Sequence, residues 1–305
     1  MTMSAGEGTA PPSACAPEAE STFLGKTRLF LEAIKVSHSV FALPFAVSSA
    51  FIALGGVPSA GQLSKIVLAV VLARTAAMAF NRWADASIDA LNPRTRGRAV
   101  PQGKLSTRFM GGAALVASAG FVAACAWIHR LAFVLSFPTL AVLLGYSFTK
   151  RFTSLSHAVL GLALGLSPLG AWIAVKEEVA LAPILLGLAV LVWTAGFDVI
   201  YACQDQEFDE RNGLHSLPRR LGIRGALLAA RCLHVATLAL LVGVGIVAGL
   251  GGYYVAGVAC VAALLAYEHS IVRPDDLSKV NVAFFTLNGL VSLVFMAAVI
   301  LDTLL

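Results

Sequence analysis

Two short segments of this chain carry paired aspartates four residues apart. Asp85 and Asp89 lie in NRWADASIDALNPRTRGR, and Asp205 and Asp209 lie in DVIYACQDQEFDERNGLHSLPRR. Magnesium usually takes one or two protein carboxylates and completes its shell with water and substrate phosphates. Both segments also contain arginine, whose guanidinium binds phosphate through paired hydrogen bonds. The two pairs therefore predict Mg²⁺ ions that hold a diphosphate.

Long apolar blocks must position these segments. The chain of 305 residues is 58% hydrophobic and only 13% charged, with a mean hydropathy of +0.82, whereas a soluble domain carries about 25% charged residues. A membrane-spanning helix needs about 20 apolar residues. We therefore expect an all-α membrane protein with nine transmembrane helices around a central cavity. The expected spans are 36–56, 65–81, 109–128, 131–149, 156–175, 181–201, 225–248, 251–270 and 281–303.

The basic residues predict the orientation of these spans. With the N-terminus in the cytoplasm, 18 of the 22 lysines and arginines fall on the cytoplasmic side, and only Arg74 lies clearly inside a span. This asymmetry obeys the positive-inside rule and places both aspartate segments in cytoplasmic loops of a multi-pass protein of the inner cell membrane. Residues 1–22, rich in Ala, Pro, Gly and Ser, are expected to be a disordered tail before one polytopic domain, 23–305.

The two aspartate segments also form a weak internal repeat. Asp85 and Asp205 are 120 residues apart, as are Asp89 and Asp209, and each pair follows two predicted spans. A pseudo-symmetric bundle would bring the two loops face to face across the central cavity.

Other polar residues near the pairs are candidates for binding the diphosphate. Asn81 precedes Asp85 by four residues, so both share a helix face with Asp89. Arg94 and Arg98 belong to a dense basic run that is explained equally well by topology setting and lipid contact. Tyr146 and Lys150, also four residues apart, could form a second cationic clamp. The six histidines have no metal-ligand spacing, and we interpret them as structural, with His215 the one to test.

Four motifs in order give these residues a family resemblance. They are N-x-x-x-D-x-x-x-D from Asn81 with the RTRGRAVPQGKLS stretch, YSFTKR from Tyr146 to Arg151, D-V-I-Y-A-C-Q-D-x-x-x-D from Asp198 to Asp209, and GLHSLPRRLG. With them the chain resembles the UbiA superfamily of intramembrane aromatic prenyltransferases over nearly its whole length. The resemblance implies nine transmembrane helices and Mg²⁺-dependent transfer of a polyprenyl group from polyprenyl diphosphate to an aromatic acid.

The resemblance also implies roles for individual residues. The metal ligands would be Asp85, Asp89, Asp205 and Asp209, assisted by Asn81. Tyr146 and Lys150 would contact the diphosphate, while Asp198 and Arg151 would lie near the aromatic acceptor as catalytic residues. Many members have arginine after the first aspartate, but here Ala86 follows Asp85, so Arg82 or Arg94 would supply that contact. The expected partners are the polyprenyl diphosphate, the aromatic acid and the lipid bilayer, with no nucleic acid.

The first span bears on the choice of acceptor. It begins KVSHSVFALPFA, where typical 4-hydroxybenzoate enzymes have R-x-D-K-P-x-G. This start is more similar to the polyprenyltransferases of the futalosine route to menaquinone. We therefore expect a dihydroxynaphthoate-type acceptor, with 4-hydroxybenzoate and ubiquinone synthesis as the alternative, and protohaem or chlorophyll-type acceptors still open.

Two other classes of membrane protein fit less well. A transporter would place its charged residues near the bilayer midplane, whereas here they gather at one edge. A CDP-alcohol phosphotransferase would carry a D-G-x-x-A-R cluster, which the sequence lacks.

Overall fold

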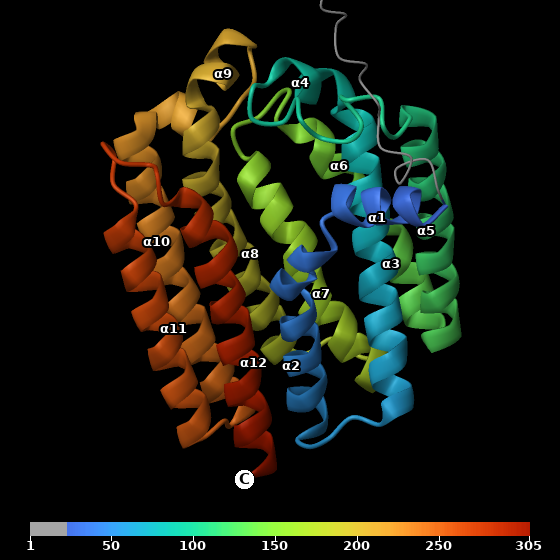
Figure 1. Ribbon diagram of the computed structural model, residues 1–305. Coiled ribbons are helices and arrows are strands. Elements are labelled where there is room, and N and C mark those ends of the chain that lie inside the picture. Colours follow the sequence, from blue (N-terminus) through green and yellow to red (C-terminus); the bar gives the residue numbers. More distant parts are fainter. Residues whose placement is uncertain (1–22) are drawn as a thin grey trace, which may run out of the picture.

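The computed structural model of the protein describes residues 23–305 (Figure 1), so the predicted tail, 1–22, lies outside the described residues. This part of the chain consists of helices and connecting turns, with no β-strand. Eight helical segments are long and apolar enough to cross a membrane. Their helices are α3 (Ala60–Ala84), α5 (Thr107–Ile128), α6 (Arg130–Thr149), α7 (Ser156–Lys176), α8 (Leu181–Ala202), α10 (Leu217–Ala248), α11 (Gly252–Ile271) and α12 (Asn288–Leu304) with the π-helical turn η4 (Val282–Leu287) before it. The protein is an integral membrane protein with the expected all-α fold.

The first predicted span, 36–56, differs from the other eight. It begins with the 3₁₀ turn η2 (Val36–Phe41) and continues as α2 (Leu43–Leu54). The apolar helical stretch, Ser39–Leu54, is about 24 Å long at 1.5 Å per residue, less than the roughly 30 Å of a hydrocarbon core. Pro44 explains the late start of α2, because proline favours the first turn of a helix and cannot continue one from before. Residues 23–305 thus contain eight helices long enough to span and one shorter apolar helix, α2, which packs against α7 and α12, so the count of nine spans stays a prediction.

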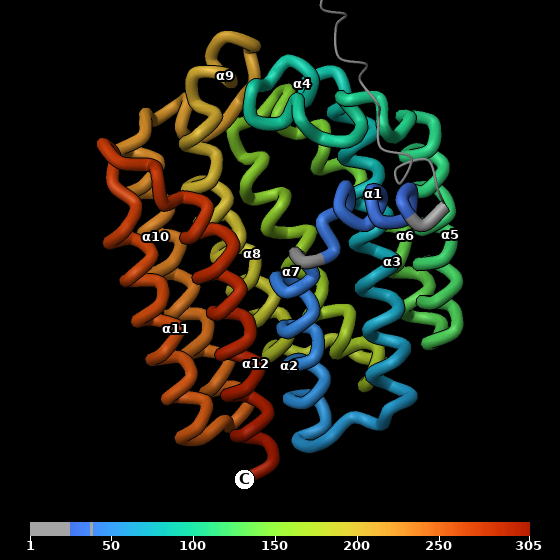
Figure 2. Tube along the Cα trace, in the orientation of Figure 1, coloured from blue at the N-terminus to red at the C-terminus, as the bar shows by residue number. Residues whose placement is uncertain are grey.

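Both aspartate segments lie at the same end of the bundle. They form the short helices α4 (Ala86–Leu91) and α9 (Gln206–Arg211), which sit close together in the Cα trace although 120 residues separate them (Figure 2). The small helix α1 (Phe23–Ala33) crosses the bundle near this end (Figure 1), and Phe30 packs edge-on against Phe109 of α5.

A matching break in the backbone precedes each short helix. Asp85 ends α3 with φ −98° and ψ 8°, and Asp205, in the turn η3 (Cys203–Asp205) after α8, has φ −102° and ψ 4°. Each is followed by a helix of six residues that carries the second aspartate. Asn81, Asp85 and Asp89 are therefore not on one continuous helix as expected. The backbone nevertheless supports the internal repeat.

Aromatic side chains fill one side of the bundle. Phe41, Phe45, Trp193, Phe197 and Phe295 are buried between η2, α2, α8 and α12, and Phe45 lies 5.1 Å from Trp193 between ring centroids. Trp193 Nε1 donates a hydrogen bond to Asn288 Oδ1 at 2.8 Å. This side of the bundle is closely packed and leaves the open space on the side of α3, α5 and α6.

Glycines bring α7 and α8 into direct contact. A Cβ atom on Gly161 would collide with the Leu191 carbonyl, and one on Gly187 would lie 2.8 Å from the Gly165 carbonyl oxygen. Real Cβ atoms do not approach other atoms this closely, so these positions require glycine. The contact fixes α7 against α8, and with it the relative position of side chains on the two helices, such as His157 on α7 and Asp198 on α8.

Candidate active site

A polar cavity of about 150 Å³ lies where the two aspartate segments meet. The turn after α4, the end of α6 and the segment η3–α9 enclose it. Its charged lining residues are Asp85, Asp89, Asp205, Arg94, Arg98, Lys150 and Arg151. Seven of the twelve residues predicted for the site therefore line one cavity.

The first aspartate pair is held largely by its own segment. Asp85 accepts hydrogen bonds from Asn81 Nδ2 at 2.7 Å and from Arg151 Nη2 at 3.2 Å. Asp89 is 6% exposed and accepts from Arg98 Nη1 at 2.8 and 2.7 Å, and Arg82 Nη1 lies 3.7 Å away. Each carboxylate thus has an arginine beside it.

The second pair is held by residues from outside its own segment. Asp205 accepts from Arg94 Nε at 2.9 Å and Nη2 at 2.5 Å, and from Asn92 Nδ2 at 3.1 Å. Asp209 is fully buried, and Lys150 Nζ lies 2.8 Å from its Oδ1. Arg94 also donates to the Tyr201 hydroxyl at 2.9 Å, so this one side chain joins the two segments.

These contacts shift the pKa values of groups at the end of the bundle. Burial raises the pKa of the Asp85 carboxyl above its ordinary value, against the hydrogen bond from Arg151. Burial lowers the pKa of Arg94, but its hydrogen bond and attraction to Asp205 outweigh this and raise it overall. Asp85 therefore gains from a nearby cation more than an exposed aspartate would.

The donor set fits magnesium. Residues 23–305 contain no group of three acidic, histidine or cysteine side chains close enough to hold one ion, which excludes a closed zinc-type site built by this part of the chain. Mg²⁺ needs fewer protein ligands, because water and phosphate oxygens complete its octahedron. Both oxygens of buried Asp209 also accept no hydrogen bond. Asp85, Asp89 and Asp205 thus offer carboxylate oxygens of the kind that Mg²⁺ uses on the wall of one cavity, and Asp209 is buried four residues beyond Asp205.

Comparison with known proteins decides the family. The model of the UbiA prenyltransferase family matches residues 42–290. The chain is 32% identical to the 4-hydroxybenzoate octaprenyltransferase of Aeromonas salmonicida (strain A449), over 82% of this chain and 86% of that protein. It is also 32% identical to the enzyme of the same name from Nitrosospira multiformis, over 83% and 87%. The chain belongs to the UbiA prenyltransferase family.

Solved structures agree with this UbiA assignment. The apo structure of a UbiA homolog from Aeropyrum pernix K1 superposes with a TM-score of 0.79 at 34% identity, covering 88% of this chain and 98% of that one. A UbiA homolog from Archaeoglobus fulgidus bound to GPP and Mg²⁺ has the same fold, with a TM-score of 0.69 at 20% identity, over 91% and 100%. The protein is a prenyltransferase, as the motifs indicated.

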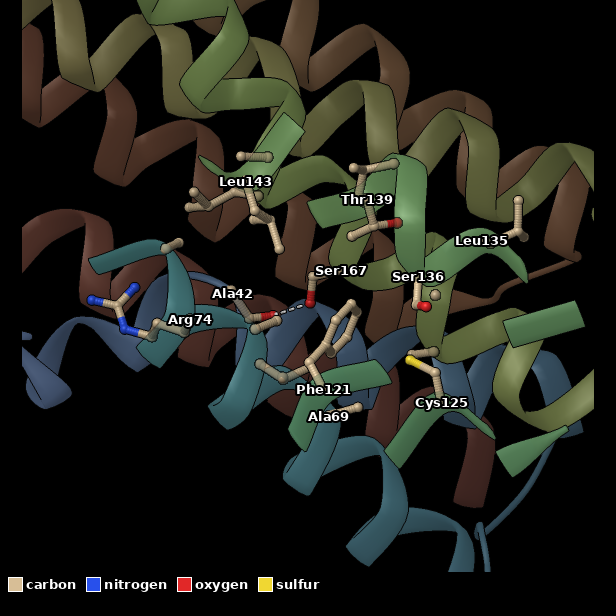
Figure 3. Close-up of a pocket in the computed structure, with 18 of the residues that line it drawn as sticks. Ala42, Ala69, Arg74, Phe121, Cys125, Leu135, Ser136, Thr139, Leu143 and Ser167 are labelled. Carbon is tan, nitrogen blue, oxygen red and sulfur yellow. Dashed lines mark hydrogen bonds between the residues drawn. The ribbon is translucent and has the colours of Figure 1, made fainter. Parts of the chain in front are cut away.

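An apolar cavity of about 180 Å³ lies next to the polar one in this UbiA protein. Leu143 and Tyr146 line the apolar cavity, and Ser147 and Lys150, on the next turn of α6, line the polar one. In Figure 3, Arg74 lies at the end opposite Cys125 and Leu135, and the Ser167 hydroxyl donates to the Ala42 carbonyl. Tyr146, which we expect to contact the diphosphate, lies on the wall of the apolar cavity, four residues before Lys150.

The two predicted catalytic residues lie apart. Arg151 donates to the Ala84 carbonyl at 2.6 Å and to Asp85, and so belongs to the first aspartate pair. Asp198 pairs with buried His157, whose Nδ1 lies 2.7 Å from Asp198 Oδ2. The Leu217 amide donates a hydrogen bond to His157 Nε2 at 3.4 Å. Nδ1 therefore carries the ring proton and donates a hydrogen bond to Asp198.

Sequence reasoning missed several residues of the site. Asn92 and Tyr201 bind Asp205 and Arg94, and His157 binds Asp198 rather than being only a packing residue. Nothing in the sequence signals His157. Arg74 did give a signal, as the charge placed inside a predicted span, where ionisable residues usually have a function.

Proposed function

We propose that this prenyltransferase uses Mg²⁺ to transfer a polyprenyl group from its diphosphate to an aromatic acid, on the cytoplasmic side of the inner cell membrane. One observation carries the proposal: an apolar cavity within the bundle lies one turn of α6 from a cavity lined by three of the four aspartates and four basic side chains. An apolar tail with a charged diphosphate head is a molecule of matching shape and polarity. The excess of lysine and arginine at this end supports the cytoplasmic assignment.

The polar cavity is suited to bind the diphosphate head. Asp85 and Asp89 would hold one Mg²⁺ and Asp205 and Asp209 another, and the metal would neutralise charge on the leaving diphosphate. Arg94, Arg98 and Lys150 would contact the phosphate oxygens directly, since guanidinium and ammonium groups form short charge-assisted hydrogen bonds with them. Asn81 and Arg82 would orient Asp85 and Asp89, as their present hydrogen bonds indicate.

The apolar cavity is suited to the reacting carbon and the tail. When the allylic C–O bond breaks, the positive charge on the prenyl group must be kept from water. The Tyr146 ring, at the junction of the two cavities, can stabilise that charge through its π face. The electron-rich acceptor ring then attacks the prenyl carbon and loses a proton. Asp198, oriented by His157, remains our candidate for taking up or relaying it.

Arg74 offers a site for the carboxylate of the acceptor. Its Nη2 donates to the Lys35 carbonyl at 2.9 Å, while its buried Nε donates no hydrogen bond. Within residues 23–305 no carboxylate forms an ion pair with it. A half-buried cation beside an apolar cavity is stabilised by an anionic ligand, and the carboxylate of an aromatic acid supplies one.

The favoured acceptor is 4-hydroxybenzoate. The relatives named above carry that activity in their names, and this outweighs the expectation of a naphthoate drawn from the first span. A dihydroxynaphthoate stays the second candidate on one specific observation. The segment that departs from the 4-hydroxybenzoate pattern starts at Lys35, whose carbonyl binds Arg74, so the departure lies where the acceptor would be recognised.

An assay with membranes that contain the protein tests the proposal. Geranyl diphosphate and Mg²⁺ are supplied with either 4-hydroxybenzoate or 1,4-dihydroxy-6-naphthoate, with EDTA controls. Prenylation of the benzoate supports the favoured acceptor, and prenylation of the naphthoate alone supports the second. Activity that persists in EDTA would contradict the metal assignment.

A variant of Arg74 tests the acceptor site. Arg74→Gln should raise KM for the acid by about 10- to 100-fold, the effect of one lost hydrogen bond to a charged group, and should leave KM for a neutral methyl ester of the acid unchanged. Arg130→Gln makes the same charge change at the opposite end of the bundle and is the control. Equal effects on acid and ester would contradict the carboxylate role.

A further inference from the structure

A second hollow lies outside the polar cavity at the same end of the bundle. It has a volume of about 400 Å³ and lies between the turn 152–154, after α6, and the residues 215–220 that begin α10. We call it the basic hollow, because His215, Arg219 and Arg220 line it and none of its lining residues is acidic. The remaining lining residues are Phe152 and three hydroxyl-bearing residues, Thr153, Ser154 and Ser216.

The charges of the basic hollow are not neutralised, unlike those of the polar cavity. The side chains of Arg220 and His215 form no ion pair or hydrogen bond with the part of the chain that the structure describes. Arg219 has no carboxylate partner there either. Its Nη1 donates to the Leu214 carbonyl at 2.6 Å, which orients the guanidinium. By contrast, every aspartate in the polar cavity has a basic partner.

A ligand in the basic hollow would be bound by side chains and not by the amides at the start of α10. The first amides of this helix are already used, because Leu217 N donates to His157 and Arg219 N donates to the Ser216 hydroxyl. The hydroxyl of Thr153 accepts from the Leu155 amide, and its own proton is not used in that bond. Two guanidinium groups, an imidazole and hydroxyl donors around one hollow match the oxygens of a phosphate group.

The basic hollow and the polar cavity share a thin wall. Lys150 and Leu214 line the polar cavity, Thr153 and His215 line the hollow, and the His215 amide donates to the Lys150 carbonyl at 2.8 Å. From these observations we propose that the basic hollow is a second binding site for a phosphate-bearing anion. Two sources of that anion share its chemistry: free diphosphate released from the neighbouring polar cavity, and the headgroup of an anionic lipid at this face of the membrane.

Binding of inorganic pyrophosphate tests the first source. The full chain is purified in detergent and titrated calorimetrically in EDTA, without a prenyl substrate, so the result does not depend on the proposed transfer reaction. Arg220→Gln should weaken binding by about tenfold, the effect of losing one charge-assisted contact. Arg224→Gln is the matched control, because Arg224 is an exposed and equally unpaired arginine four residues further along α10 that does not line the hollow.

Lipid retention tests the second source. The same three proteins are reconstituted in phosphatidylcholine nanodiscs with and without phosphatidylglycerol, extracted and weighed by native mass spectrometry. Loss of bound phosphatidylglycerol in Arg220→Gln alone identifies a lipid headgroup, and weakened pyrophosphate binding in that variant alone identifies the free anion. If Arg220→Gln and Arg224→Gln behave alike in both experiments, the basic hollow is not an anion site.

Discussion

The two aspartate segments have nearly the same backbone but different partners. Both break the helix at the first aspartate and place the second in a helix of six residues. The first pair is neutralised by Arg82 and Arg98 of its own segment and by Arg151. The second pair relies on Arg94, from the first segment, and on Lys150, from α6. The repeat therefore reproduces the aspartates but not their partners, and side chains of the first segment contact both pairs.

Loss of a carboxylate should have the largest effect. Asp205→Asn removes a predicted metal ligand and the partner of Arg94, and should lower prenyl transfer by about a hundredfold or more at saturating Mg²⁺. Glu207→Gln is the control, because this exposed acid on α9 pairs only with Arg211. If Asp205→Asn keeps full activity while Mg²⁺ is still required, the second segment does not hold the metal.

Loss of Arg94 should have the second-largest effect, and it should affect the second aspartate segment more than the first. Arg94→Gln should lower activity by about 10- to 100-fold, because a bidentate charged contact is lost. It should also speed hydrogen exchange in 206–216, since Arg94 is the side chain of the first segment that holds Asp205 by charge. Arg96→Gln, in the same run but without a side-chain partner in the described chain, should do neither. Faster hydrogen exchange in residues 85–91 alone would show that Arg94 supports the first segment and not the second.

Loss of Lys150 should lower the stability of the fold as well as the activity. Lys150→Gln leaves Asp209 buried without a positive partner, which should cost about 1–2 kcal/mol after allowing for the 34% exposure of the Lys150 side chain. The thermal unfolding temperature should fall in EDTA and recover in part with Mg²⁺, which can neutralise Asp209. Lys176→Gln, exposed at the other end of the bundle, is the control. An unchanged unfolding temperature would show that Asp209 does not need the lysine.

Loss of His157 should have the smallest effect and concerns the second segment alone. His157 accepts a hydrogen bond from the Leu217 amide near the end of that segment, whereas the backbone of the first segment is bound from outside by Arg151, at the Ala84 carbonyl. His157→Gln can still bind Asp198 and should lower kcat only severalfold, about 1 kcal/mol, whereas His157→Ala should lower it further and shift its pH dependence. Equal kcat values for the two variants would assign His157 to packing only.

The sequence identifies the acidic residues that meet at the candidate site better than it predicts their arrangement. Spacing was enough to single out the four aspartates, because carboxylates beside apolar blocks need a compensating charge. It could not show that Arg94 crosses to Asp205, since that pair depends on two segments 111 residues apart meeting at one end. Nor could it show the break at Asp85, which follows from local backbone geometry, or the shortness of α2, whose apolar run continues through a turn that is not α-helical.

The glycine contact between α7 and α8 bears on the length of the prenyl chain. Because Gly161, Gly165 and Gly187 leave no space between these helices, α7 is a fixed wall of the apolar cavity, backed by the packed aromatic side of the bundle. The opposite wall is formed by α3, α5 and α6, which lie at the edge of the bundle (Figure 1). A tail too long for the cavity must therefore push that wall outwards or pass through it, so the membrane itself becomes part of the measure of chain length.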